Sequence, residues 1–303
     1  MKRLKLVLGG IAAVLVLAIA WVAVISESRL SHVHAVEVPP RVPDPGLAAE
    51  GRQLARSRGC MDCHGEDLGG HVVLDEPLFA RVVGDNLLRP PEGQAGATTW
   101  ERMYRALVHG VDLESRPLLM MPSASYTHLS LHEIEAIAAY VEGLPSGGRD
   151  LPASRLGPIG RVLLATGQFE GMLPVEVIDH HARPIERPPP IGTAEYGRHV
   201  AQLCVGCHRA DFAGGPVALG QPDWPPAANL TPHASGLARW SQADFMRAMR
   251  EGRRPDGSGI DAEAMPWRAF GQASDAELLA VWRFLRSLPP VDRGGPHDAR
   301  PSH

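Results

Sequence analysis

The sequence predicts an all-α protein built from two similar small helical domains in tandem. A stretch around Cys60 recurs around Cys204, 144 positions later, together with much of its flanking sequence. A period this long indicates duplicated domains, because solenoid repeats are shorter. Each copy also carries amphipathic helical patterns that begin at capping residues. Neither copy contains a convincing run of the alternating pattern that is typical of strands.

The N-terminal segment is expected to cross a membrane. Residues 6–25 are uncharged and mostly apolar, and about 20 such residues span a bilayer as a helix. Three cationic residues precede this run, which places the N-terminus in the cytoplasm and the rest of the chain outside it. The competing interpretation is a cleaved signal peptide, since residues 18–20 match the small-x-small cleavage pattern. Cleavage there would leave the apolar residues 21–25 at the new N-terminus, so we favour an uncleaved anchor.

The rest of the chain divides around the two copies. Residues 146–192 are rich in Gly and Pro, but Ile159–Ile178 is too apolar for a free linker and is expected to pack against one or both domains. The expected order is an anchor or signal (1–26), a tether (27–45), a first domain (46–145), an interdomain segment (146–192), a second domain (193–290) and a disordered tail (291–303).

Each copy is expected to hold three main helices joined by long loops. The first leads into the cysteine pair, the second begins at Thr98 or Ser241, and the third begins at Ser130 or Ser274. The second and third begin with capping-box patterns, in which an acidic residue follows the cap by three positions. A Leu-Pro pair then ends each third helix, because proline cannot continue it.

Both cysteine pairs have the spacing that attaches a c-type haem. The motifs are Cys60-Met61-Asp62-Cys63-His64 and Cys204-Val205-Gly206-Cys207-His208. Two thiols on one helical turn can reach the two vinyl groups of one porphyrin, and the histidine that follows lies under the ring as an iron ligand. A redox disulfide or a zinc site would not require a histidine after each pair in two separate repeats. The sequence therefore predicts two covalently bound haem c groups, with His64 and His208 as proximal iron ligands.

Methionine is the expected second ligand of each iron. Met121 and Met265 both lie 61 residues after the first cysteine of their copy, both precede proline, and both come before the third helix. The competing interpretation is a methionine of the core. Met120 is the main competitor in the first copy, and the lower-ranked alternatives are His109, His71 and His233.

Two other pairs of residues recur at matching places. Asn86 matches Asn229, and Trp100 matches Trp240. Hydrogen bonding to haem propionates is one interpretation. Turn formation by asparagine and core packing by tryptophan is the other, and the sequence does not favour either.

On these residues the chain resembles the class I cytochromes c, and in particular the multi-haem cytochrome subunits of membrane-bound alcohol and gluconate dehydrogenases. The matching stretches are Glu195–Arg198, Cys204–His208, Ala228–Pro232, Arg254–Gly257, Met265–Trp267 and the helix Asp275–Pro289. The resemblance implies two tandem cytochrome c domains with His/Met ligation at both irons. Those subunits carry three haem domains, whereas this chain has two attachment motifs, and its single N-terminal helix is expected to anchor it.

The expected function is electron transfer at the outer face of a bacterial cell membrane. The resemblance implies a dehydrogenase or quinol-oxidising donor and an oxidase or soluble cytochrome acceptor. With both irons six-coordinate, no catalytic residue is expected; the alternative is a di-haem peroxidase-like enzyme with one open iron. The net charge of −4 argues against a nucleic-acid partner.

Overall fold

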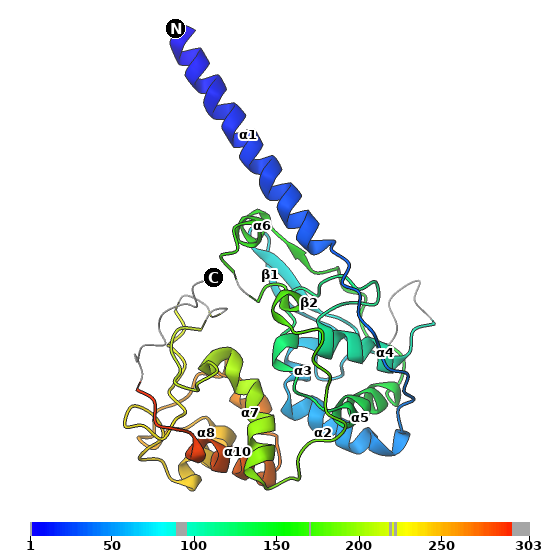
Figure 1. Cartoon of the computed structure of the whole chain (residues 1–303), viewed down its shortest axis with the longest axis vertical. Coiled ribbons are helices and arrows are strands. Elements are labelled where there is room, and N and C mark those ends of the chain that lie inside the picture. The colour runs from blue at the N-terminus through cyan, green and yellow to red at the C-terminus, as the bar shows by residue number, and fades with distance from the viewer. Residues whose placement is uncertain (1, 89–95, 170, 218–219, 221–222, 293–303) are drawn as a thin grey trace.

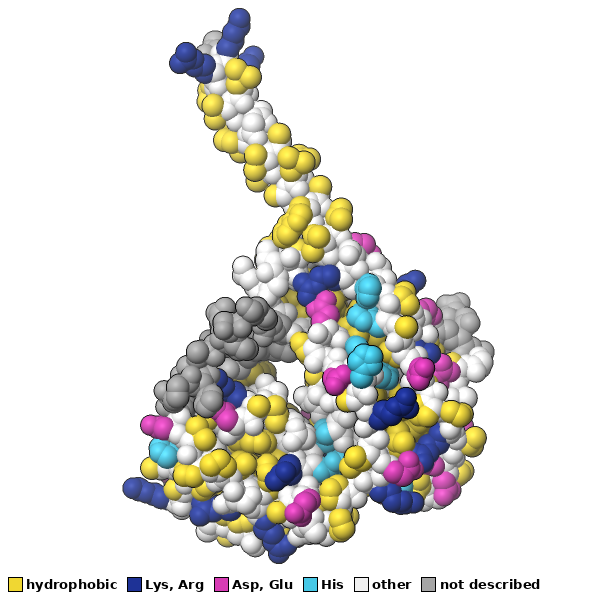
Figure 2. Space-filling view, viewed as in Figure 1, with side chains coloured by type: hydrophobic (Ala, Val, Ile, Leu, Met, Phe, Trp, Pro, Cys, Tyr) yellow, Lys and Arg dark blue, Asp and Glu magenta, His cyan; other side chains and the backbone are white. Residues whose placement is uncertain are grey.

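In the computed structural model a long helix stands out from a body that contains both copies (Figure 1). The structure describes residues 2–88, 96–169, 171–217, 220 and 223–292. Most of the expected tail, residues 293–303, lies outside this range. The projecting helix is α1 (Lys2–Leu30), which is long and apolar enough to cross a membrane. Figure 2 shows hydrophobic side chains along it and cationic side chains at its N-terminal end.

Both copies contain the expected helices. The first copy contains η1 (Pro45–Leu47), α2 (Ala48–Ser57), α3 (Cys60–His64), α4 (Thr99–Tyr104), the π-helical turn η2 (Arg105–His109), η3 (Ser123–Ser125) and α5 (Leu131–Glu142). The second contains α7 (Ala194–His208), α8 (Gln242–Glu251), α9 (Trp267–Phe270) and α10 (Asp275–Ser287). Between them lie α6 (Pro158–Ala165) and η4 (Pro174–Val177). Full capping boxes open α5, α8 and α10, whereas at α4 the side chain of Thr98 accepts a hydrogen bond from the Glu101 N–H.

The same glycine-mediated helix crossing forms the centre of each copy. A Cβ atom on Gly51 of α2 would lie 1.8 Å from the Ala136 carbonyl oxygen of α5. A Cβ atom on Gly197 of α7 would lie 2.0 Å from the Ala280 carbonyl oxygen of α10. Only glycine lets these backbones approach so closely, and each pair then buries its apolar faces in a core of its own copy.

Alanine at either crossing glycine should therefore destabilise the protein. We expect Gly51→Ala and Gly197→Ala each to lower the free energy of unfolding by about 1–3 kcal/mol or more, because the added methyl group forces the helices apart. Gly143→Ala is the matched control, since Gly143 has a φ of −76° and a Cβ there would meet its nearest neighbour at 3.4 Å. Urea unfolding measures all three, and equal stability of the crossing variants and the control would contradict this packing.

A small antiparallel sheet departs from the all-α prediction. It has the order β1 (His71–Glu76), β2 (Ala80–Gly84) and β3 (Arg155–Leu156). A register shift between Val72 and Leu74 interrupts the β1–β2 pairing. The strands are short and this bulge breaks their alternation, which is why the pattern gave no strand signal. The hairpin follows the first cysteine motif, and β3 comes from the interdomain segment.

The interdomain segment packs against the first copy, as its apolar content led us to expect. Leu164, Met172 and Leu173 are almost fully buried in a cluster that also contains Ala80 and Val82 of β2. This cluster lies between the sheet, α6 and the loop that precedes Met121, so the segment covers one side of the first copy.

The two copies contact one another through matching residues. Gln53 and His199 each lie two positions after the crossing glycine of their own helix. The Gln53 side-chain amide donates a hydrogen bond to the Gln272 carbonyl of the second copy. The His199 ring lies 5.1 Å from the ring of His128, the residue of the first copy that corresponds to Gln272. The contact is therefore close to two-fold symmetric, and it brings both cysteine-bearing helices to the interface.

One local difference breaks this symmetry. Gly51 precedes Cys60 by two more residues than Gly197 precedes Cys204. In the second copy α7 runs without interruption into its cysteine motif, whereas in the first copy α2 ends at Ser57 and α3 begins at Cys60. Two residues lie between these helices. Arg58 follows α2, and Gly59 adopts a left-handed φ of 77° just before α3.

Candidate functional site

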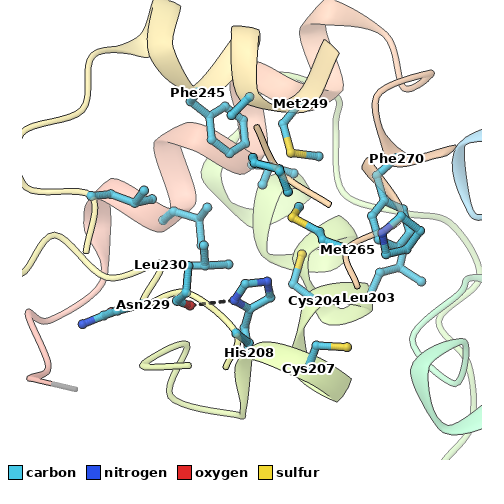
Figure 3. Close-up of a pocket in the computed structure, with 18 of the residues that line it drawn as sticks. Leu203, Cys204, Cys207, His208, Asn229, Leu230, Phe245, Met249, Met265 and Phe270 are labelled. Carbon is cyan, nitrogen blue, oxygen red and sulfur yellow. Dashed lines mark hydrogen bonds between the residues drawn. The ribbon is translucent and has the colours of Figure 1, made fainter. Parts of the chain in front are cut away.

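A cavity of about 370 Å³ in the second copy contains the predicted site residues. Figure 3 shows Cys204, His208 and Met265 directed toward this space. Its apolar lining comes from α7, α8, α9, α10 and the loops between them, and includes Leu203, Leu230, Phe245, Phe270, Val281 and Leu285. The motif and the methionine, far apart in sequence, therefore meet across one apolar cavity.

The first copy has a corresponding cavity of about 520 Å³. Its lining includes Cys60, Cys63 and His64 of α3 and also Met120 and Met121. Residues of the sheet and of the interdomain segment complete it, including Val82, Val83, Leu156 and Arg161. The sheet thus forms a wall of this site.

Both motif histidines are oriented by a backbone carbonyl. The Nδ1 of His64 lies 2.8 Å from the Asp85 oxygen, and the Nδ1 of His208 lies 2.7 Å from the Ala228 oxygen. A carbonyl can only accept, so Nδ1 carries the proton and Nε2 keeps its lone pair for a metal. Burial lowers the pKa of both histidines, although the carbonyl contact partly opposes this effect. Both imidazoles are therefore held in the neutral form that binds a metal.

The four motif cysteines are free thiols. None of them forms a disulfide. Burial, the largest cause, raises the pKa of Cys60 and of Cys204 to about 12 and also raises those of Cys63 and Cys207. These thiols lack the lowered pKa of a redox-active pair.

The backbone around Met121 matches that around Met265. In each case the proline that follows is the centre of a tight turn, with φ/ψ of −77°/49° at Pro122 and −76°/56° at Pro266. The N–H two residues after each methionine donates to the methionine carbonyl at 2.7 Å. These angles are close to those of an inverse γ-turn. The equal spacing in the sequence therefore corresponds to an equal local conformation.

Met120 has a different conformation and different neighbours. Its φ is +60°, its N–H donates to the Met172 carbonyl at 2.9 Å, and its side chain packs with the cluster between sheet and α6. Met121 instead packs with the helical core of the first copy. Both line the cavity, but His109 does not: its Nδ1 lies 3.1 Å from the Nδ1 of His180.

Both asparagines stabilise loops. The Asn229 side chain accepts from the Thr231 N–H at 2.8 Å and donates to the Val291 carbonyl at 2.7 Å. The Asn86 side chain accepts from the Leu88 N–H at 2.9 Å and donates to the Gly147 carbonyl at 2.8 Å. These contacts correspond to the turn interpretation. They also stabilise the loops that contain the Asp85 and Ala228 carbonyls, which orient the two motif histidines.

The two tryptophans differ. Trp100 is a core residue whose indole N–H donates to the Pro39 carbonyl, whereas Trp240 lines the second cavity.

A buried charge cluster lies between the copies, and the sequence predicted no role for its members beyond helix capping by Glu133 and Glu277. Arg58 is only 2% exposed, lines the cavity of the second copy, and lies 3.0 Å from Glu277 and 3.9 Å from Glu133. Glu277 also accepts from the Tyr196 hydroxyl at 2.9 Å, and Glu133 accepts from His199 Nε2 at 2.7 Å. One arginine from the first copy thus links the capping glutamates of both third helices.

These contacts keep the cluster charged despite its burial. Burial opposes the charge of Arg58, but Glu277 and Glu133 outweigh it and raise the pKa of the guanidinium. Burial would raise the pKa of Glu133, but His199, the Ser130 N–H and Arg58 together lower it to about 2. Glu277 follows the same pattern: Arg58 and the Ser274 N–H lower its pKa against the effect of burial.

Acid should therefore destabilise the protein through this cluster. A carboxylate whose pKa is lower in the folded state contributes its stabilisation above the unfolded value of 4.5, and that contribution is lost as the pH falls toward about 2. We expect the free energy of unfolding to fall by roughly 2–3 kcal/mol over this range on account of Glu133. Urea unfolding between pH 7 and pH 2.5 measures the loss. Glu133→Gln should be less stable at pH 7 but should lose less on acidification; an unchanged pH dependence would contradict the assignment. The exposed Glu142→Gln is the control.

Each cavity fits a covalently bound haem c. Two free thiols one helical turn apart lie beside the apolar space, and a neutral imidazole keeps its Nε2 lone pair. A methionine lines the same cavity as that imidazole. Histidine and methionine are an established pair of axial ligands for electron-transfer haems.

Comparison with known proteins agrees with this chemistry. A model of the cytochrome c family matches residues 48–145 and 194–289. The cytochrome c subunit of alcohol dehydrogenase (quinone) from Gluconacetobacter polyoxogenes is 25% identical over 279 residues, which cover 82% of this chain and 57% of that subunit. The corresponding subunit from Gluconobacter oxydans is 24% identical over 282 residues, or 83% of this chain and 56% of that subunit.

A further relative matches a shorter stretch. A nicotinate dehydrogenase subunit of Pseudomonas putida is 36% identical over 122 residues, which cover 36% of this chain and 10% of that protein. The chain spans a little over half the length of the alcohol dehydrogenase subunits that it matches.

Proposed function

Because the chain belongs to the cytochrome c family, we propose that it is a membrane-anchored di-haem cytochrome that carries electrons on the outer side of a bacterial cell membrane. Residues 46–145 and 193–290 form its two haem-binding domains. The observation that carries the proposal is the repeated arrangement of two thiols, a carbonyl-oriented histidine and a methionine followed by a tight Pro turn.

The side chains of each site have distinct roles. Cys60 and Cys63 tether the first haem, and Cys204 and Cys207 tether the second. In this proposal His64 and His208 would each supply an imidazole ligand to one iron, and Met121 and Met265 would each supply a sulfur ligand. When bound, the haem iron supplies one-electron redox chemistry. The protein fixes both ligands, excludes water with an apolar lining and thereby stabilises the less charged state of the site.

This arrangement supports electron transfer rather than catalysis. A haem enzyme needs a free or displaceable iron position, whereas a histidine and a methionine both line each cavity and could occupy both positions. Two of the relatives are cytochrome c subunits of a quinone alcohol dehydrogenase, so the peroxidase-like alternative is not favoured. We therefore assign no catalytic residue to this chain.

The names of the relatives suggest the electron donor. Two of them are cytochrome c subunits of a quinone alcohol dehydrogenase. A dehydrogenase that releases electrons outside the cytoplasm is accordingly the donor that we propose. A membrane oxidase or a soluble cytochrome is the proposed acceptor, and α1 holds the chain at the membrane.

The haem content tests the proposal. Protein produced with a c-type maturation system should carry two haems that remain attached after denaturation, measured by the pyridine haemochrome spectrum against protein mass. Cys60→Ala/Cys63→Ala and Cys204→Ala/Cys207→Ala form a matched pair, and each should retain one covalent haem. A single haem in the unsubstituted protein would refute the two-site proposal.

A further inference from the structure

The junction between α1 and the body is held by specific contacts. Arg29 forms an ion pair with Glu176 and donates to the Leu164 carbonyl of α6. Arg161 of α6 reaches back to α1, with its guanidinium 3.0 Å from the Ser26 hydroxyl and 3.1 Å from Glu27. The last turns of α1 therefore lie directly against α6.

These contacts set the direction of α1 relative to the body. Ser26 is fully buried, and Leu30 packs with the cluster between the sheet and α6. Because ion pairs and buried side chains join the two helices, the orientation of the body follows that of α1.

The outer face of α6 is apolar and exposed. Gly160 and Leu164 face the body and are buried, whereas Ile159 and Val162 on the other side are 49% and 44% exposed. Leu78, at the turn between β1 and β2, is 65% exposed and its carbonyl accepts from the Ile159 N–H. Leu78, Ile159 and Val162 form what we call the α6 patch.

The α6 patch lies on the side of the body from which α1 projects. Figure 1 shows α6 beside the end of α1, with the tandem helical cores on the opposite side of the sheet. A lipid bilayer that surrounds residues 6–25 would reach the base of α1, which is where α6 packs. For the residues that the structure describes, the position of the α6 patch therefore favours membrane lipid as the partner that covers it.

We propose that the α6 patch lies in the outer interface of the membrane, as a second contact beside α1. This inference rests on the proposed membrane anchoring. An apolar helical face beside a spanning helix inserts its side chains at the boundary between headgroups and acyl chains. The haem body would then have one orientation relative to the bilayer.

Spin labels in the full-length haem protein test the proposal. Single cysteines replace Val14 in α1, Val162 in the α6 patch, and Ile191, which lies three residues before the start of α7. All three side chains are exposed, so the substitutions should leave the fold intact. The native cysteines are taken up by haem, and the unsubstituted protein serves as the labelling control.

The probe is a phosphatidylcholine–phosphatidylglycerol vesicle that contains only this protein. Power saturation of the nitroxide spectrum compares access to oxygen, which enters lipid, with access to a water-soluble nickel chelate. We expect the oxygen-to-nickel ratio at Val162 to be several-fold higher than at Ile191 and to approach that at Val14.

Three other results are possible, and each contradicts a different part of the proposal. If the label at position 14 contacts lipid and the label at position 162 contacts water, the membrane contact of the α6 patch is refuted, but the anchoring by α1 is not. Low access of both reagents to Val162 shows that protein, for example a second copy, covers the patch, and it also refutes lipid contact. Water exposure at Val14 refutes the membrane anchoring itself and the inference with it.

Discussion

We expect Met121→Ala to open the first proposed haem site to carbon monoxide and Met120→Ala to leave it closed. Loss of the distal sulfur creates a free iron position in the ferrous protein. It should also lower the potential of that haem by roughly a tenth of a volt or more, within the ~0.8 V that axial ligands span in haem proteins. A carbon monoxide difference spectrum and a redox titration measure the two effects.

The reason for choosing Met121 over its neighbour is conformational. Met121 and Met265 share the tight turn at the following proline, and both accept a hydrogen bond from the second N–H after them. Met120 has a left-handed backbone, and its side chain packs with the sheet-side cluster. Two adjacent residues with such different conformations cannot exchange roles without a change in the loop.

Met265→Ala is the matched variant in the second copy and should give the same carbon monoxide band for the other haem. If Met120→Ala binds carbon monoxide and Met121→Ala does not, the correspondence between the copies is wrong by one residue. If neither variant binds it, the distal ligand is a residue other than these two methionines.

The largest loss of stability should come from Arg58→Gln. Removing one partner of a buried ion pair leaves the other charges uncompensated, which typically costs about 3–5 kcal/mol. Arg58 faces Glu133 and Glu277, and both carboxylates are largely excluded from water. We expect the variant to unfold at clearly lower urea concentration and to loosen the contact between the copies.

Two further variants isolate the cause. The exposed Arg52→Gln, six residues earlier in the same copy, removes a cation without a buried partner and should change the stability by no more than about 0.5 kcal/mol. Glu277→Gln in the Arg58→Gln background should recover part of the loss, because it removes one of the unpaired charges. Additive losses in the double variant would show that the two residues are not coupled.

The helices and the motif residues could be predicted because their signals are local. Capping residues such as Ser130 and Ser274 and the attachment motifs need only neighbouring positions to be recognised. The sheet was missed because β1 contains a bulge and because β3 comes from a segment about 70 residues farther along the chain. Pairing between distant segments leaves little trace in a single sequence.

Arg58 could not be assigned a role from the sequence for the same reason. Its partners, Glu133 and Glu277, are capping residues of helices in two different copies, and capping alone explains their presence. The one available signal was the two-residue difference in spacing between the crossing glycine and the first cysteine. The difference in spacing became informative only when the structure showed that Arg58, which lies in this stretch, is at the interface between the copies.

The approximate two-fold relation between the copies is the relation found in a homodimer, in which one surface patch meets itself. Two identical subunits would place the same side chain on both sides of the axis, so a lone off-axis arginine would break their symmetry. Covalent fusion removes this constraint, because each half can then change independently. Among the residues that the structure describes, the buried arginine Arg58 lies in the first copy, next to the two extra residues of spacing before Cys60. The present chain therefore combines the packing of a symmetric dimer with an internal asymmetry that separate, identical subunits could not encode.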